Sequence, residues 1–277
     1  MSTAKLRALG RNMLELYTRL RLPMAAAALS YFMTMTFFPL LICLYTMLGS
    51  AFPASGEILR FLAGLLPEST IEAILDYLRY VSDNLSTTMS VVAVTVMATS
   101  AAAGFRTIDR VMGEMRGTRR YSGVFALVFS FCFSLIFLAA IYFAVLLILT
   151  GKWFLEFVDR HIMFVNISSG WRWGRFVLLY LLLFVLLCGV YRITAPRRRS
   201  VRLLPGAALA SAALVAVSIL FSGFIGASTR YPLVYGSLAS IIIMMIWMYT
   251  CGLILFLGNA LNVSLERVDR QEKGGVL

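Results

Sequence analysis

The stretch GSLASIIIMMIWMYTCGLILFLGNALNVS, residues 236–264, contains no charged side chain. A helix needs about 20 mainly apolar residues to cross the hydrocarbon core of a bilayer, so this stretch predicts a transmembrane helix. The whole chain has the same character, because 60% of its 277 residues are hydrophobic and 14% are charged. In soluble domains about 45–50% of the residues are apolar and about 25% are charged. We therefore predict an all-α, polytopic membrane protein.

Six apolar stretches are long enough to span a membrane, and no linker divides the chain, so residues 1–277 are predicted to form one membrane domain. The expected spans are about 24–49, 88–110, 123–150, 173–195, 203–227 and 236–264. The first is too long for the roughly 7–15-residue apolar core of a signal peptide and is expected to remain in the protein. The fifth is rich in small residues, from Gly206 onward, and is expected to lie centrally in the bundle.

The distribution of basic residues predicts the orientation. The chain has 25 Lys and Arg against 13 Asp and Glu, a formal net charge of +12. Most of the basic residues lie in the N-terminal segment, the second and fourth connections and the C-terminal tail, and cytoplasmic loops carry such an excess. Both termini are therefore predicted to be cytoplasmic. Anionic membrane lipids are the expected partners, with Arg197, Arg198 and Arg199 as the headgroup contact, and no nucleic-acid partner is expected.

Two segments outside the spans predict further helices. Residues 4–22 place Leu6, Leu9, Met13, Leu16 and Leu20 on one third of a helical wheel, with Arg7, Arg11, Glu15 and Arg19 opposite. Such an amphipathic helix lies in the cytoplasmic membrane interface, and packing against the underside of the bundle is an equally good interpretation. The first external loop, 50–87, predicts two short helices that are interfacial or form a lid, the second beginning with a capping box of Ser69 and Glu72.

Polar residues in the first span are candidates for a functional site, because an unpaired polar group in hydrocarbon costs free energy. Ser30 and Thr34 lie one turn apart, and Pro39 removes a backbone hydrogen bond from the middle of the span. These groups form a site of hydration or motion, or else the hydroxyls bond back to their own helix.

Two further polar faces lie in the second and sixth spans. Their members are Thr95, Thr99, Arg106 and Asp109 in the second span and Asn259, Asn262 and Glu266 in the sixth. Arg106 and Asp109 are spaced as an ion pair. Both faces end on the same predicted side of the membrane, and if they meet they form the best candidate polar site in the chain. Alternatively, the charged residues lie at the interface, where their side chains reach water.

No arrangement typical of an enzyme active site occurs in the sequence. The cysteines, Cys43, Cys132, Cys188 and Cys251, stand singly in apolar stretches and predict neither a disulfide nor a metal site. The single histidine, His161, lies in a predicted external loop with Asp159 nearby and no second ligand, and no nucleotide-binding loop is present. We predict no catalytic residue, no metal and no cofactor, and expect that the protein is not an enzyme.

A series of short motifs runs through the chain. The first span contains AAALSYF at 26–32 and FPL at 38–40. The carboxyl half contains YR at 191–192, Pro196, LPGA at 204–207, YGSLA at 235–239, WMY at 247–249 and LGNALN at 257–262. In this order the motifs resemble the YihY/BrkB family of bacterial inner-membrane proteins, over nearly the whole chain. The chain departs from the family pattern at Asn259, where an acidic residue is expected.

The resemblance implies a six-helix protein of the bacterial cytoplasmic (inner) membrane, associated with the cell envelope. Lipid or lipopolysaccharide-precursor transport is suggested for some members, and others carry the older label of ribonuclease BN. Ribonuclease activity is not expected here, because RNA hydrolysis needs a metal cluster or a general acid–base pair. Two interpretations remain: a transporter or flippase for a lipid or other amphiphile in envelope maintenance, or a non-transporting scaffold that organises lipids or partner proteins. A homo-oligomer or an unidentified envelope partner is compatible with both.

Overall fold

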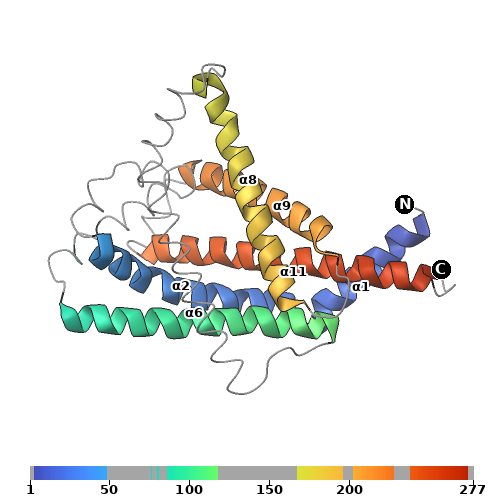
Figure 1. The fold of residues 1–277 in the computed structure, drawn as a ribbon, viewed down its shortest axis with the longest axis horizontal. Coiled ribbons are helices and arrows are strands. Elements are labelled where there is room, and N and C mark those ends of the chain that lie inside the picture. The colour runs from blue at the N-terminus through green and yellow to red at the C-terminus, as the bar shows by residue number, and fades with distance from the viewer. Residues whose placement is uncertain are drawn as a thin grey trace.

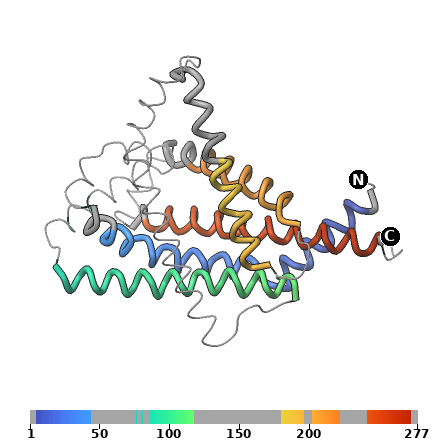
Figure 2. The backbone as a smooth tube through the Cα atoms, in the orientation of Figure 1, coloured from blue at the N-terminus to red at the C-terminus, as the bar shows by residue number. Residues whose placement is uncertain are grey.

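The computed structural model describes residues 3–48, 86–117, 167–195, 202–227 and 238–273, together with Asp76 and Tyr80 (Figures 1 and 2). All regular structure in these residues is helical, as predicted. The helices are α1 (Thr3–Arg19), α2 (Leu22–Leu48), α6 (Thr87–Arg116), α8 (Ile167–Thr194), α9 (Leu204–Ala227) and α11 (Leu238–Lys273).

Four of the described helices are long and apolar enough to cross a membrane. Their apolar segments are Leu22–Cys43, Thr87–Arg116, Leu204–Phe221 and Ile241–Glu272, which correspond to the first, second, fifth and sixth predicted spans. Helix α8 covers the fourth, with a shorter described apolar segment at Tyr180–Thr194. The predicted span at 123–150 and almost all of the loop at 50–87 lie outside the described residues, so the count of six spans stays a prediction.

Local signals define the ends of α6. Its N-cap is Ser86, whose hydroxyl accepts the backbone N–H of Met89 at 3.1 Å. At the other end, Gly117 adopts the left-handed conformation at φ 66°, and its N–H bonds to the carbonyl of Glu114 at 3.2 Å. The helix therefore continues for nearly two turns past the predicted end at residue 110. This extension brings Arg116 into the last turn of α6.

Helices α2, α6 and α11 run alongside one another, with α9 packed on α11 and α8 crossing α9 (Figure 1). Leu29 of α2 is 2% exposed and lies between two glycines of its neighbours. A Cβ added at Gly104 of α6 would lie 3.7 Å from its Cδ1, and one added at Gly252 of α11 would lie 3.2 Å from its Cδ2. The small residues let three backbones approach around a single leucine. The main buried cluster includes side chains from all six described helices.

Helix α1 packs along the C-terminal part of α11. Its buried residues are Ala8, Asn12 and Leu16, so the contacting face is rotated toward one edge of the predicted apolar stripe. Leu6, on the other edge of the stripe, stays 62% exposed. Lys5 pairs with Glu272 at 2.6 Å across this contact. The helix is present as predicted and contacts the bundle, while its position relative to a membrane remains a prediction.

Candidate functional site

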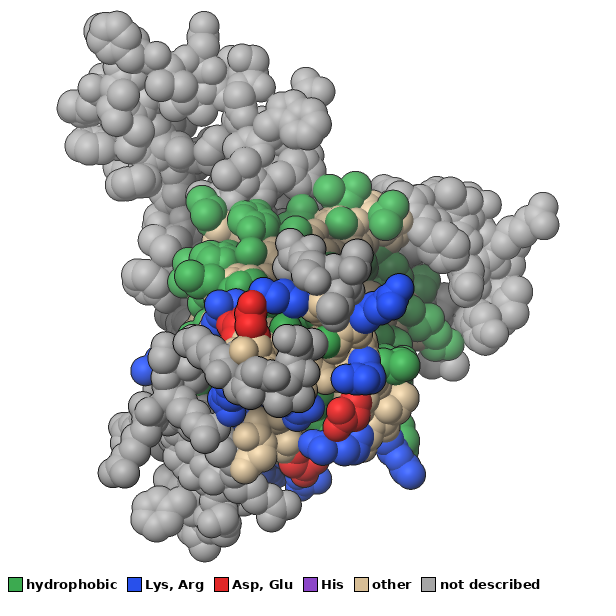
Figure 3. Space-filling model, turned by 90° about the vertical axis from the view of Figure 1, so that its right-hand side faces the viewer, with side chains coloured by type: hydrophobic (Ala, Val, Ile, Leu, Met, Phe, Trp, Pro, Cys, Tyr) green, Lys and Arg blue, Asp and Glu red, His purple; other side chains and the backbone are tan. Residues whose placement is uncertain are grey.

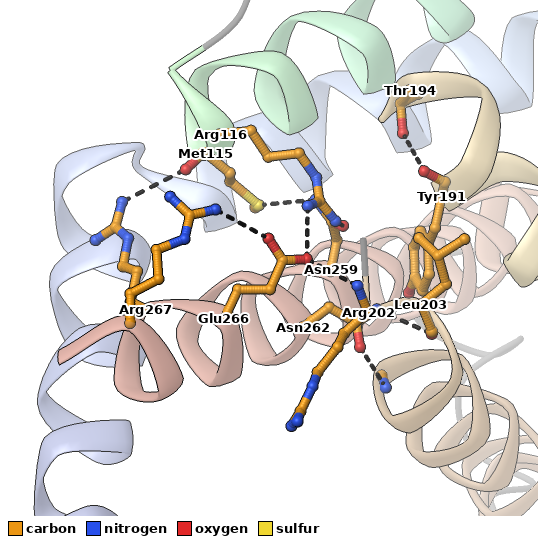
Figure 4. A network of polar contacts seen from close by, with 12 residues as sticks. Met115, Arg116, Tyr191, Thr194, Arg202, Leu203, Asn259, Asn262, Glu266 and Arg267 are labelled. Carbon is orange, nitrogen blue, oxygen red and sulfur yellow. Dashed lines mark hydrogen bonds and ion pairs between the residues drawn. The ribbon is translucent and has the colours of Figure 1, made fainter. Parts of the chain in front are cut away.

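Polar side chains of α6 and α11 meet the N-terminus of α9 at one end of the bundle (Figure 4). We call this arrangement the polar junction. It consists of Arg116, Asn259, Asn262 and Glu266, with the backbone of residues 202–206. The two asparagines are fully buried, and the side chains of Arg116 and Glu266 are 5% and 15% exposed. Charged groups buried to this extent need partners, because leaving them unpaired is costly.

Arg116 joins the end of α6 to α11 through two hydrogen bonds. Its Nη1 donates to Glu266 Oε1 at 2.9 Å, and its Nη2 donates to Asn259 Oδ1 at 3.1 Å. The amide Nδ2 of Asn259 returns to α6, where it donates to Met115 Sδ at 3.3 Å. Arg267 adds a contact to the same turn, because its Nη2 donates to the Met115 carbonyl at 3.4 Å. These bonds hold the C-terminal turn of α6 against the polar face of α11.

The same face of α11 caps the beginning of α9. The first N–H groups of a helix have no partner within the helix, and Leu203 has no side-chain acceptor to offer them. Asn262 supplies the acceptor, since its Oδ1 receives the Gly206 N–H at 2.7 Å while its Nδ2 donates to the Leu203 carbonyl at 3.0 Å. Glu266 Oε1 accepts the Arg202 N–H at 3.0 Å. A carboxylate beside a helix N-terminus is also favoured by the helix dipole.

Helices α9 and α11 approach very closely next to this cap. A Cβ added at Gly206 would collide with the Gly258 carbonyl oxygen and lie 2.5 Å from Asn262 Nδ2. A Cβ at Gly258 would collide with the hydroxyl of Tyr191, which donates to the Leu255 carbonyl at 2.8 Å. Both positions therefore require glycine. The small residues that predicted a central fifth span allow Asn262 to reach the start of α9.

Positive charge surrounds the carboxylate of Glu266. Besides its bond to Arg116, its Oε2 lies 3.8 Å from Arg270 Nη2. The Arg202 side chain turns outward to Asp269, with Nη2 2.8 Å from Oδ2. The buried Nε of Arg116 has no hydrogen-bond partner in the described part of the chain. The junction is thus an anion-binding arrangement whose anion is a side chain of the protein itself.

The polar junction lies at the charged end of the bundle. Figure 3 faces this end, and Lys, Arg, Asp and Glu side chains gather on it, with hydrophobic side chains along the upper rim. The 30 residues of α6 span about 45 Å, which exceeds the roughly 30 Å hydrocarbon core of a bilayer. Arg106 is the first charged residue of α6, and Arg116 lies ten residues, or about 15 Å, further on. If the apolar part of α6 occupies the hydrocarbon core, Arg116 lies on the water side of that core, at or beyond the headgroup layer.

The structure brings together the three residues predicted at the end of the sixth span, Asn259, Asn262 and Glu266. Their partners on α6 include Met115 and Arg116, whereas the sequence offered Arg106 and Asp109 as the residues that would complete the site if the two faces meet. Both of those residues are half-buried, two to three turns before Arg116 on α6. Arg116 was missed because the predicted span ended at residue 110. Its position seven residues after Asp109, on the same helical face, is the signal that locates it.

The other predicted site residues lie away from the polar junction. Ser30 and Thr34 are buried in α2: the Ser30 hydroxyl donates to the Ala27 carbonyl at 2.8 Å, while the Thr34 hydroxyl has no hydrogen-bond partner among the described residues. Pro39 lies within α2, which continues to Leu48. Thr95 and Thr99 are exposed on α6 and donate to carbonyls of their own helix at 2.9 and 2.8 Å. Arg197, Arg198 and Arg199 are outside the described residues.

Comparisons with known proteins place the chain among membrane proteins. A family model described as virulence factor BrkB matches residues 13–275. Over 248 residues, 87% of this chain and 89% of the relative, the sequence is 26% identical to YfkH of Bacillus subtilis (strain 168), which is described as ribonuclease-like. Over 118 residues, 42% of this chain and 40% of the relative, it is 31% identical to the UPF0761 membrane protein IL2447 of Idiomarina loihiensis. No solved structure matches the chain.

Proposed function

The chain belongs to the YihY/BrkB family of membrane proteins, and from this premise we propose that it transports a lipid or another amphiphile across the membrane. The observation that carries the proposal is the polar junction. Three helices are held together at one end by an ion pair and amide hydrogen bonds, as shown in Figure 4. On the water side of the hydrocarbon core, water and lipid headgroups compete for such bonds, and this competition is what would let the three helices separate at this end.

The proposed setting is the bacterial inner membrane, with both termini in the cytoplasm. Both termini lie at the same end of the bundle in Figure 1, the end at which the polar junction is found. An excess of Lys and Arg at that end is typical of the cytoplasmic side. The proposed partners are anionic lipids. Labelling of single cysteines at the two termini with a membrane-impermeant maleimide in intact spheroplasts tests the orientation, and labelling without permeabilisation would contradict it.

A flux measurement tests the transporter proposal. The full chain is reconstituted into liposomes with a fluorescent phospholipid, and a membrane-impermeant quencher is added outside. We expect the wild type to expose the inner-leaflet lipid to the quencher, and Arg116→Ala to slow this strongly while the protein stays folded. Thr99→Ala is the control, because Thr99 is exposed and bonds only within α6. Quenching that stops at the outer leaflet for folded wild type would contradict the proposal.

A scaffold is the second candidate, favoured by the way the junction side chains satisfy one another. Asn262 caps α9 with both ends of its amide, and Arg116 pairs with Glu266. A scaffold needs only such contacts. If the protein is a scaffold, variants should lose function in proportion to their loss of stability, and no lipid flux should occur. We propose no ribonuclease activity, because RNA hydrolysis needs a metal cluster or an acid–base pair and the junction offers one ion-paired carboxylate, two amides and an arginine.

A further inference from the structure

We propose that the polar junction binds a phosphate-bearing anion and that Glu266 occupies this anion site as an internal competitor. The inference rests on the proposed function, because it names the class of headgroup that the same site would recognise. Two donors converge on the Glu266 carboxylate: Arg116 Nη1 at 2.9 Å from α6 and the Arg202 N–H at 3.0 Å from the segment just before α9. Guanidinium groups and helix N-termini are the donors that proteins use for phosphate.

Arg116 provides an independent indication of a ligand. Its side chain is 5% exposed, and its buried Nε has no acceptor within the described residues. A guanidinium presents five N–H groups in a planar fork, which suits two oxygens of one phosphate. The carboxylate of Glu266 accepts a hydrogen bond from one of these groups of Arg116, Nη1.

The surroundings of Glu266 allow it to leave. Its side chain is 15% exposed, so it lies at the edge of the junction and not in its centre. Arg270, one turn later on α11, is 59% exposed, and its Nη2 is already 3.8 Å from Glu266 Oε2. When the carboxylate turns outward, it therefore meets a second guanidinium in water. The buried Arg116 stays in place for the incoming anion.

If the apolar part of α6 fills the hydrocarbon core, Arg116 lies on the water side of that core, where lipid headgroups and soluble anions both have access. A phosphodiester of an anionic phospholipid and free phosphate share the chemistry that the junction recognises. The experiment therefore uses both probes, phosphatidylglycerol and inorganic phosphate, on the detergent-solubilised full chain. Native mass spectrometry counts bound lipid, and the shift in melting temperature reports phosphate.

The test compares two variants that make the same chemical change. Glu266→Gln removes the internal competitor, and Glu114→Gln removes a carboxylate that is exposed on the last turns of α6. We expect Glu266→Gln to raise the affinity for phosphatidylglycerol at least about tenfold, because it leaves the Arg116 charge without a counter-ion. Glu114→Gln should change it less than about twofold, as expected for an exposed charge. Adding Arg116→Gln to Glu266→Gln should abolish the gain.

The outcomes separate the inference from the proposed function. Equal affinities of Glu266→Gln and Glu114→Gln, or a gain that survives Arg116→Gln, would overturn the inference. A gain for inorganic phosphate but not for the lipid would identify a soluble anion as the ligand. If Glu266→Gln does not fold, photoactivatable phosphatidylglycerol is crosslinked to the wild type, and crosslinks that avoid both residues 111–117 and 202–206 overturn the inference. If the folded wild type binds phosphatidylglycerol at the polar junction but shows no lipid flux, the transport proposal is contradicted and the inference about the anion site is not.

Discussion

The substitution Asn262→Ala should destabilise the protein by about 2–4 kcal/mol. Asn262 is fully buried and holds both the Gly206 N–H, at 2.7 Å, and the Leu203 carbonyl, at 3.0 Å. Loss of a helix N-cap costs about 0.5–2 kcal/mol, and a buried donor left without an acceptor costs about 1–3 kcal/mol. The two figures overlap, because the Gly206 N–H is counted in both. The truncated side chain also leaves a cavity where α9 crosses α11, and this adds to the cost, so the total destabilisation is expected at about 2–4 kcal/mol.

The assay is reversible unfolding of the full chain in mixed micelles with increasing SDS, followed by circular dichroism. Ser211→Ala is the matched control, because Ser211 is also fully buried, lies on α9, and donates only to the Ala207 carbonyl of its own helix at 2.7 Å. Since that carbonyl belongs to the helix ladder, we expect Ser211→Ala to cost less than about 1 kcal/mol. If Asn262→Ala is within about 1 kcal/mol of Ser211→Ala, the capping of α9 by α11 is refuted.

Three further substitutions test the packing around the junction, each by the same unfolding measurement. Gly258→Ala should destabilise the protein by about 1–3 kcal/mol, because its Cβ would collide with the Tyr191 hydroxyl and lie 2.7 Å from the Ala210 Cβ. Gly189→Ala is the control, because a Cβ there has nothing within 4 Å, and it should cost no stability. Equal losses of stability for the two variants would contradict the close approach of α9 and α11. Tyr191→Phe should cost about 0.5–1.5 kcal/mol, since it removes a 2.8 Å hydrogen bond to α11, and an unchanged stability would argue against that bond. Lys5→Ala should cost less than about 1 kcal/mol, an effect that disappears at high salt, because its ion pair is partly exposed; a salt-independent loss would show that the contact is buried.

The sequence alone predicted where the long apolar helices of the described part of the chain lie. Transfer of a side chain from water to hydrocarbon depends mainly on that side chain, so a sum over neighbouring residues identifies a span without knowledge of its partners. The spans at 24–49, 88–110, 203–227 and 236–264 all correspond to described helices of sufficient length and apolarity. The polar face of α11 and the small residues of α9 were also evident, because 3.6-residue periodicity is a local property.

The tertiary structure decided which of these faces meet and at what height. The sequence offered Arg106 and Asp109 as possible partners for the end of α11, and the structure adds Arg116, which pairs with Glu266 because α6 continues to residue 116. Nothing local to Asn262 indicates that it caps another helix, 56 residues away in the chain. Such contacts depend on the crossing point and relative axial shift of two helices, which are set by steric fit between them, here by Gly206 against Gly258. Local hydrophobicity produces the helices, and the fit between their surfaces positions the charged and amide groups of the site.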